Sequence, residues 1–390
     1  MGGVTTYVGA TEAARMLGVS KPTLYAYVSR GMLRRETAVD GRTSLYARED
    51  VERLASRGRR RQAPERPTID VQVTSSITHL HDERVTYRGH DVARLAASCA
   101  YEQVAELLLT GTLPASTEPW RVDRGGLERC RAVTDAAGAR DPVTVLSLAA
   151  ATLADLRPDD DAATAARTLL AVIPTLLGGP LRGDFADRLT RAWVRRPAPE
   201  LVTAISRALV LLADHELATS TLAVRVACSV RADPYSAIGA GLAVVRGPYH
   251  GAANRAVTGL LDRAEQIGAG RAVAERLERG ERLPGFGHSV YRRGDPRFEP
   301  LLDAVRTLPR SERVGVVDAV LAEAGRSVGQ LPNVDLALGA LIHVAGLAQD
   351  VPLFAIARIS GWAAHYLEEQ RERPVRYRGL ARQPANVARV

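Results

Sequence analysis

The sequence has little cysteine, a single lysine, few aromatic residues and no long apolar run. Its three cysteines (Cys99, Cys130 and Cys228) are odd in number and far apart, which argues against a disulfide framework or a zinc ribbon and favours a reducing compartment. Uncharged stretches such as residues 168–181 are shorter than the ~20 apolar residues that a membrane-spanning helix needs. The N-terminus lacks the basic-then-apolar layout of a secretory signal. We therefore expect a cytoplasmic protein without a membrane segment, and we find no spacing typical of metal ligands.

The composition that remains is that of an ordinary globular protein. Hydrophobic residues make up 46% and charged residues 25% of the 390 residues, which excludes a disordered or fibrous protein. A chain of this length exceeds what one hydrophobic core usually organises, so we expect two or three domains.

Positive charge is concentrated at the N-terminus. Residues 1–67 carry 13 Lys and Arg against 7 Asp and Glu, whereas the remaining residues carry 39 against 37. This asymmetry is typical of a small phosphate-binding module. The stretch RGRRRQAPERP (57–67) holds five arginines and two prolines and almost nothing apolar, so we assign residues 58–67 to a solvated linker.

Residues 10–57 have the pattern of a helix-turn-helix. Thr11 can cap a first helix, and Gly18 provides the turn. Ser20 can cap a second helix, in which Pro22 occupies the first turn, where a missing N–H costs nothing. In such a motif the second helix enters the major groove of DNA. The side chains that could contact DNA are Lys21, Thr23, Tyr25 and Arg30.

The run AARMLGVSKPTLYAYVSRGML, followed by an Asp40-Gly41 turn and REDVERL, resembles the winged helix of the MerR-like and excisionase-like proteins. The resemblance covers about 45 residues and implies a winged helix-turn-helix domain at residues 1–57. DNA is therefore a candidate partner. Such modules also serve as protein–protein adaptors, so both uses stay open.

Beyond the linker the sequence predicts a mainly α-helical protein. In YEQVAELLL (101–109), Val104, Leu107 and Leu108 have the i, i+3, i+4 spacing of a core-facing helix, and Gly111 supplies a stop signal. Similar patterns recur in residues 144–156, 163–177, 199–213, 218–230, 255–278 and 335–349.

Four short segments contain residues suited to chemistry. ADHELATST contains His215, and the turn GPYHGAAN (247–254) projects His250 from the backbone. Taken alone, each histidine has a structural explanation: a half-buried residue and a turn residue. In GFGHSVYRRGDPRF (285–298), glycines, His288 and three arginines together favour an anionic, oxygen-rich ligand. PNVDLALGAL contains Asp335, which by itself could simply be a helix N-cap.

Taken together, in this order, the four segments resemble the signatures of citrate synthase. The stretches 86–114 and 354–379 match the entry and C-terminal arginine segments of that family, so the resemblance runs from about residue 77 to residue 380. It implies a large helical domain made of residues 68–251 and 347–390 and a small helical domain at residues 252–346.

The resemblance also implies roles for individual residues. Asp335 is the base that removes a proton from acetyl-CoA, His250 stabilises the resulting enol or enolate, and His288 polarises the ketone of oxaloacetate. The oxaloacetate ligands are His215, Arg297, Arg358 and Arg373, the last reaching from a partner subunit of a homodimer. The coenzyme A ligands are Gly285, Phe286, Gly287 and Arg292. Apart from the coenzyme A thioester, which is a substrate, no cofactor and no metal are implied.

Two alternatives stay open at this point. A 2-methylcitrate synthase would use propionyl-CoA, and one extra methylene changes binding by only ~1–3 kcal/mol in an apolar pocket. A regulator could instead use the synthase-like body as an oxaloacetate or acyl-CoA sensor. The presence of His250, His288 and Asp335 favours the enzyme, since a pure sensor needs the arginines more than the base.

Overall fold

The computed structural model of the chain has two compact units, Met1–Val73 and Thr74–Val390. The residues that the structure describes are 7–17, 19, 21–29, 32–38, 43–52, 72–81, 84–247, 250, 253–288, 290, 291 and 293–378.

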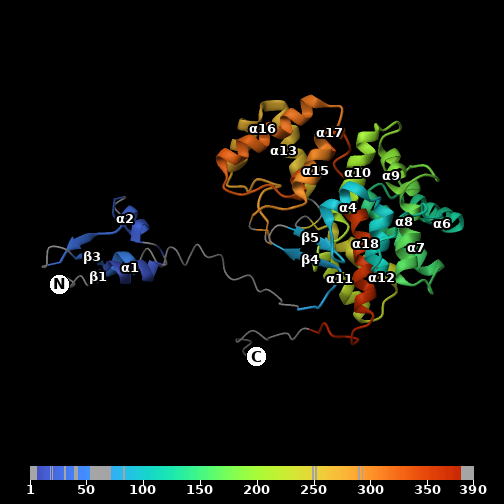
Figure 1. Cartoon of the computed structure of the whole chain (residues 1–390), viewed down its shortest axis with the longest axis horizontal. Coiled ribbons are helices and arrows are strands. Elements are labelled where there is room, and N and C mark those ends of the chain that lie inside the picture. Colours follow the sequence, from blue (N-terminus) through green and yellow to red (C-terminus); the bar gives the residue numbers. More distant parts are fainter. Residues whose placement is uncertain are drawn as a thin grey trace, which may run out of the picture. The chain divides into compact units, whose positions relative to one another are not determined.

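The first unit contains the short helices α1 and α2 beside a three-stranded antiparallel sheet (Figure 1), and residues 48–52 are helical as well. Its elements are β1 (Tyr7–Gly9), α1 (Ala10–Leu17), α2 (Lys21–Ser29), β2 (Arg35–Thr37) and β3 (Ser44–Ala47). Tyr46 of β3 pairs with Val8 on one side and Arg35 on the other, and it is fully buried with Leu24 in a small separate core. The predicted helix-turn-helix and wing strands are thus present. Strand β1 was not predicted, and the Asp40-Gly41 turn lies outside the described residues.

The second unit is mainly helical, which confirms the predicted fold class. It begins with a small antiparallel sheet of β4 (Thr78–His81), β5 (Arg84–Tyr87) and β6 (His90–Asp91). Its helices are α4 (Val92–Ser98), α5 (Tyr101–Thr110), α6 (Arg124–Ala136), α7 (Pro142–Leu156), α8 (Ala162–Leu176), α9 (Phe185–Trp193), α10 (Pro199–Leu212), α11 (Thr219–Ser229), α12 (Pro234–Val245), α13 (Ala253–Ile267), α14 (Ala269–Glu278), α15 (Phe298–Arg306), α16 (Ser311–Ser327), α17 (Val334–Ala345) and α18 (Leu353–Glu369). Of the helices described, none is both long and apolar enough to cross a membrane.

Helix α18 lies at the centre of one helical group, and it packs against α5, α8, α10, α11 and α12 (Figure 1). It is buried on nearly every side, and Arg358, His365 and Glu369 are among its buried residues. Two glycines permit its close contacts. A Cβ on Gly361 would lie 2.4 Å from the carbonyl oxygen of Ala213, and one on Gly241 of α12 would lie 2.9 Å from the Trp362 ring.

Helices α13, α15, α16 and α17 form a second group beside the first (Figure 1). Helix α17 packs against α13, α15 and α16, and α10 contacts both α15 and α17. The start of α17 therefore approaches the first group. The predicted limits of a small domain at residues 252–346 stay a prediction.

Candidate active site

One cavity of about 440 Å³ brings together six of the predicted site residues. They come from segments far apart in the sequence: the α10–α11 connection, the turn before α13, the segment before α15, and the starts of α17 and α18. The residues that line the cavity are Leu80, His215, Glu216, Leu217, Ala218, Thr219, His250, His288, Val290, Arg297, Val334, Asp335, Phe354 and Arg358.

The His250 ring contacts a hydroxyl group that also accepts a hydrogen bond from an indole. Its Nε2 lies 2.8 Å from Oγ of Ser220, and the indole N–H of Trp362 donates to the same Oγ at 3.3 Å. Because Trp362 can only donate, the Ser220 hydroxyl can direct its own proton to His250 Nε2, which leaves the histidine proton on Nδ1. Burial, and secondarily the charge of Arg358, lower the pKa of His250 to about 4. His250 is therefore a neutral hydrogen-bond donor near pH 7.

His288 is also fixed as a neutral donor. Its Nδ1 accepts the backbone N–H groups of Val290 at 3.0 Å and Tyr291 at 3.3 Å, so the ring proton must be on Nε2. Burial and the nearby Arg297 lower its pKa. Its ring lies 5.4 Å from that of His215, whose Nε2 is 2.8 Å from the Tyr291 hydroxyl. The pKa of His215 is likewise well below its ordinary value, chiefly through burial.

The two cavity arginines have different environments. Arg297 forms a bidentate pair with Asp295, with Nε and Nη2 at 2.9 and 2.8 Å, and Asp295 also accepts the Val334 backbone N–H at 3.0 Å. Arg358 is 1% exposed and lies over the Phe354 ring at 4.6 Å, but its Nε and Nη1 have no hydrogen-bond partner within the described residues. A buried cation in this state favours an anionic ligand.

Asp335 lies in the first turn of α17 without capping it. The cap is Asn333, whose side-chain oxygen accepts the Asp335 N–H at 3.0 Å and whose amide donates to the Gly287 carbonyl at 2.7 Å. The alternative explanation of Asp335 as a helix N-cap is therefore wrong, and Asp335 lines the cavity. Burial raises the pKa of Asp335 above its ordinary value, against the opposing effect of Arg297. A carboxylate with a raised pKa is a stronger base.

The other predicted site residues lie elsewhere. Gly285 and Gly287 have φ angles of +81° and +78°, and a Cβ on Gly285 would lie 2.7 Å from that of Leu336, so Gly285 lets the loop pack on α17. The Gly287 N–H already donates to the Leu331 carbonyl at 2.8 Å. Phe286 forms a β-bridge with Pro332 and is buried. Arg292 lies outside the described residues, and exposed Arg373 is not among the described residues that line the cavity.

Several residues of the site were not singled out from the sequence. Asp295 and Tyr291 lie in the glycine-rich segment 285–298, where an aspartate two residues before an arginine could have indicated the pair. Ser220 and Trp362 carried no such signal, since only the fold brings them to His250.

One group with metal-ligand chemistry lies away from the cavity. Ligand atoms of Asp262, Glu265 and His343 lie within 4.8 Å of one another. Both carboxylates already accept protein donors, from Gln349 to Asp262 at 2.8 Å and from Arg313 to Glu265 at 3.0 Å. These contacts account for the group as part of the packing between α13, α16 and α17.

Comparison with known proteins identifies the second unit. The family model "Citrate synthase, C-terminal domain" matches residues 70–378. The chain belongs to the citrate synthase family. It is thus an enzyme of a family that condenses an acyl-CoA with oxaloacetate, as predicted. A helix-turn-helix family model matches residues 7–59, which confirms the second resemblance.

Both branches of the citrate synthase family occur among its relatives. The 2-methylcitrate synthase of Mycobacterium tuberculosis H37Rv is 32% identical, over 73% of this chain and 81% of that protein. Citrate synthase 2 of Bacillus subtilis is 29% identical, over 77% and 90%. The crystal structure of citrate synthase from Pyrobaculum aerophilum has a TM-score of 0.68 at 25% identity, over 82% of this chain and 92% of that one. A Thermoplasma acidophilum citrate synthase complex has the same fold, with a TM-score of 0.69 at 24% identity over 83% and 96%.

Proposed function

We propose that this enzyme condenses acetyl-CoA with oxaloacetate and water to give citrate and coenzyme A. The observation that carries the proposal is the placement of one basic carboxylate, two neutral histidine donors and a buried guanidinium, with two nitrogens unpaired among the described residues, around a single cavity.

In this mechanism Asp335 removes a proton from the methyl carbon of the acetyl thioester. The electron pair moves to the thioester oxygen, where the Nδ1–H of His250 stabilises the enol or enolate. The methyl carbon then attacks the ketone carbon of oxaloacetate, whose oxygen is polarised by the Nε2–H of His288, and the proton that Asp335 has taken up balances the alkoxide that forms. Water finally hydrolyses the citryl thioester, which releases citrate and coenzyme A.

The neutrality of the two histidines supports these roles. An α-proton of a thioester is far less acidic than a carboxylic acid, so Asp335 alone could hold only a trace of carbanion. Fixed donors aimed at the oxygens where charge develops lower that barrier without having to reorganise. A lowered pKa keeps His250 in the one-proton form that the shared hydrogen bond with Ser220 orients.

Oxaloacetate carries two carboxylates, and the cavity offers cations for them. We assign one carboxylate to Arg358, whose Nε and Nη1 meet no acceptor in the described part of the chain, and place Arg297 and His215 beside the substrate. Arg373 would complete the site of a second copy. In support of a homodimer, Val226 and Val230 lie one helical turn apart and are 40% and 60% exposed. Val375, which is 60% exposed, lies near these two valines in space, because its N–H donates to the Ser229 carbonyl.

The first experiment is to supply oxaloacetate with either acetyl-CoA or propionyl-CoA and to follow the release of free coenzyme A thiol. Asp335→Asn tests the base, and Asp135→Asn, an exposed aspartate on α6, is the matched control. We expect turnover that is lost in Asp335→Asn and kept in Asp135→Asn. Faster turnover of propionyl-CoA would make the protein a 2-methylcitrate synthase. No turnover of either donor would overturn the proposal and favour the sensor.

We propose DNA binding as a second function, through the helix-turn-helix unit. It is supported by the family match, by the net positive charge of this part of the sequence and by Tyr25, which is 48% exposed on α2. Thr23 lies half-buried on the same helix, whereas the side chain of Lys21 and all of Arg30 lie outside the described residues. Selection of bound sequences from random DNA with the full chain tests it, with Tyr25→Ala expected to weaken binding. Binding that oxaloacetate leaves unchanged would exclude coupling between the two functions.

A further inference from the structure

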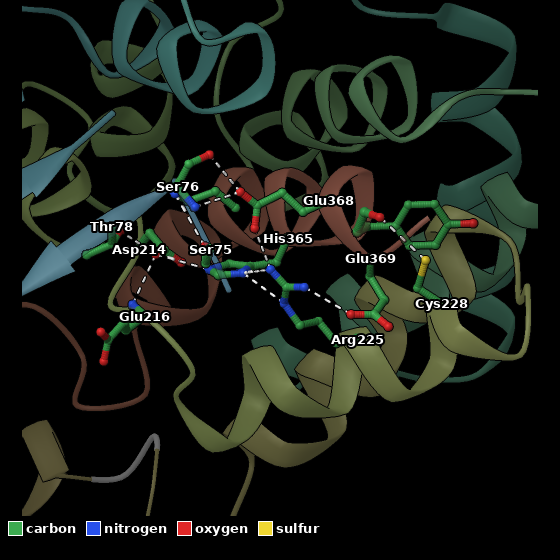
Figure 2. A network of polar contacts seen from close by, with 12 residues as sticks. Ser75, Ser76, Thr78, Asp214, Glu216, Arg225, Cys228, His365, Glu368 and Glu369 are labelled. Carbon is green, nitrogen blue, oxygen red and sulfur yellow. Dashed lines mark hydrogen bonds and ion pairs between the residues drawn. The ribbon is translucent and has the colours of Figure 1, made fainter. Parts of the chain in front are cut away.

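A buried network of charged and polar side chains begins directly beside the oxaloacetate-binding turn (Figure 2). Asp214, which precedes His215, is fully buried. Its Oδ2 accepts the Thr78 hydroxyl at 2.6 Å and the Glu216 backbone N–H at 3.1 Å, and it lies 3.3 Å from His365 Nε2. One end of the network thus fixes the turn that carries His215.

The proton on His365 is assigned by its neighbour Arg225. Nε and Nη2 of Arg225 lie 3.1 and 2.9 Å from His365 Nδ1. Since a guanidinium has no acceptor, Nδ1 must accept, and the ring proton is on Nε2, where it donates to Asp214. His365 therefore joins Asp214 to Arg225 in one orientation only, and all three side chains are fully buried.

The network continues from Arg225 to the segment that follows α18. Nη1 of Arg225 donates to Glu369 at 2.9 Å, and Glu369 forms a bidentate pair with Arg376, at 2.7 and 2.5 Å. The Tyr377 hydroxyl also donates to Glu369, at 3.0 Å. A buried carboxylate that meets two guanidinium groups and a hydroxyl is well compensated, and such a network specifies one arrangement of its members.

The segment held in this way has a strained backbone. Val375 has a φ of +56°, a conformation that β-branched residues rarely adopt, although its side chain is 60% exposed. Such strain persists where the surroundings impose it. Here Glu369 holds the following Arg376, the Ser229 carbonyl accepts the Val375 N–H at 2.9 Å, and Arg231 donates to the Glu372 carbonyl at 3.0 Å. Arg373 lies within this segment.

We propose that Arg225, His365 and Glu369 are positioning residues for oxaloacetate binding. They hold the turn that carries His215 and the segment that carries Arg373 in one fixed relation through the core of the chain. This inference rests on the oxaloacetate site of the proposed function, in which His215 and Arg373 are ligands, and not on turnover. A substitution in the network should weaken oxaloacetate binding although none of its members reaches the cavity lining.

The test measures KM for oxaloacetate and for the acyl-CoA separately, together with oxaloacetate binding by calorimetry. The variants are Arg376→Gln, at the partly exposed end of the network, and His365→Leu, with His365→Gln as the conservative variant that keeps one acceptor and one donor. We expect KM for oxaloacetate to rise about tenfold or more, as for loss of one hydrogen bond to a charged group, with KM for the acyl-CoA unchanged. His365→Gln should recover most of the affinity.

Matched controls separate this effect from general destabilisation. Arg167→Gln removes another bidentate pair, with both contacts to Glu106 at 2.7 Å. His343→Leu removes another buried histidine bonded to an aspartate, Asp262, at 2.7 Å. Both controls should stay within about twofold of the unmodified enzyme in each KM. Network variants that change KM no more than these controls would overturn the inference.

A double-mutant cycle tests the route through Arg373. In an Arg373→Ala background, Arg376→Gln should add little further loss of oxaloacetate affinity, because residues that act through one another are not additive. Losses that multiply fully would show that the network does not act through Arg373 and would overturn the proposal. If the unmodified protein binds oxaloacetate without turnover, the proposed function fails and the calorimetric comparison still decides the inference. If it neither binds nor turns over, both fail.

Discussion

Replacement of Arg358 by methionine should strengthen the ligand-free fold and weaken oxaloacetate binding at the same time. The side chain is 1% exposed, its Nε and Nη1 meet no acceptor among the described residues, and its main compensation is the Phe354 ring 4.6 Å away. Burial lowers its pKa in spite of the favourable charge of Asp214, so the folded protein disfavours the charged form. Methionine has a similar length and no charge to desolvate.

The magnitude follows from these contacts. A buried donor without a partner costs about 1–3 kcal/mol, so the two atoms together cost about 4 kcal/mol. A desolvated cation–π contact offsets about 2 kcal/mol of this. Arg358→Met should therefore stabilise the ligand-free protein by about 2 kcal/mol. It should also remove charge-assisted hydrogen bonds to a substrate carboxylate, about 3 kcal/mol or roughly a hundredfold in KM for oxaloacetate.

Thermal melting of the ligand-free protein and KM for oxaloacetate measure the two effects. Arg188→Met is the matched control, because Arg188 is equally buried but donates to the carbonyls of Pro180 and Ala171 and to the Thr175 hydroxyl. That variant should melt at a lower temperature, since it leaves buried acceptors without donors. An Arg358→Met protein that melts lower and keeps its affinity for oxaloacetate would refute the reasoning.

Three further predictions follow from the site. Tyr291→Phe removes the 2.8 Å contact with His215 and should raise KM for oxaloacetate about fivefold, with little change in KM for the acyl-CoA. Ser220→Ala leaves His250 without its fixed partner and should lower kcat about tenfold in the thiol-release assay while the melting temperature changes little. The pKa of His250 is about 4 in the folded protein and about 6.5 in the unfolded chain, so the unfolded chain binds the proton first as the pH falls. The contribution of His250 to stability should therefore be complete above pH 6.5 and decrease as the pH drops towards 4. Melting temperatures of the unmodified protein and of His250→Asn, compared over this pH range, measure the effect.

Local signals in the sequence predicted most of the helices, and short motifs indicated the segments that contain the candidate site residues. The spacing of Val104, Leu107 and Leu108 predicts α5, and all three residues are fully buried. The histidines and Asp335 were singled out because the four segments together resemble the citrate synthase signatures, whereas each residue taken alone had a structural explanation. The assignment of Asp335 as a possible cap failed, because the cap of α17 is Asn333, two residues earlier, which accepts the Asp335 N–H.

The remaining features depend on contacts between distant parts of the chain. His365 and Arg225 are 140 residues apart, and each alone has the pattern of an ordinary residue on one face of a helix. Arg297 is paired with Asp295, so Arg358 is the cavity arginine with less compensation of its charge. The sequence alone cannot show this difference between the two arginines. Strand β1 is only three residues long and is stabilised by β3, so its own sequence carries little information.

The close approach at Gly361 has a consequence for how this enzyme tolerates mutation. A methyl group there would meet the Ala213 carbonyl and the Asp214 carboxylate, which would push α18, and with it Arg358, away from the turn that carries His215. In a library that replaces every residue in turn and selects for activity, position 361 should be as intolerant as Asp335, although glycine supplies no reacting atom. The positions that are sensitive to mutation would therefore extend through the core along α18. Only a measurement of which inactive variants still bind oxaloacetate would distinguish positions needed for the reaction from positions needed for close packing.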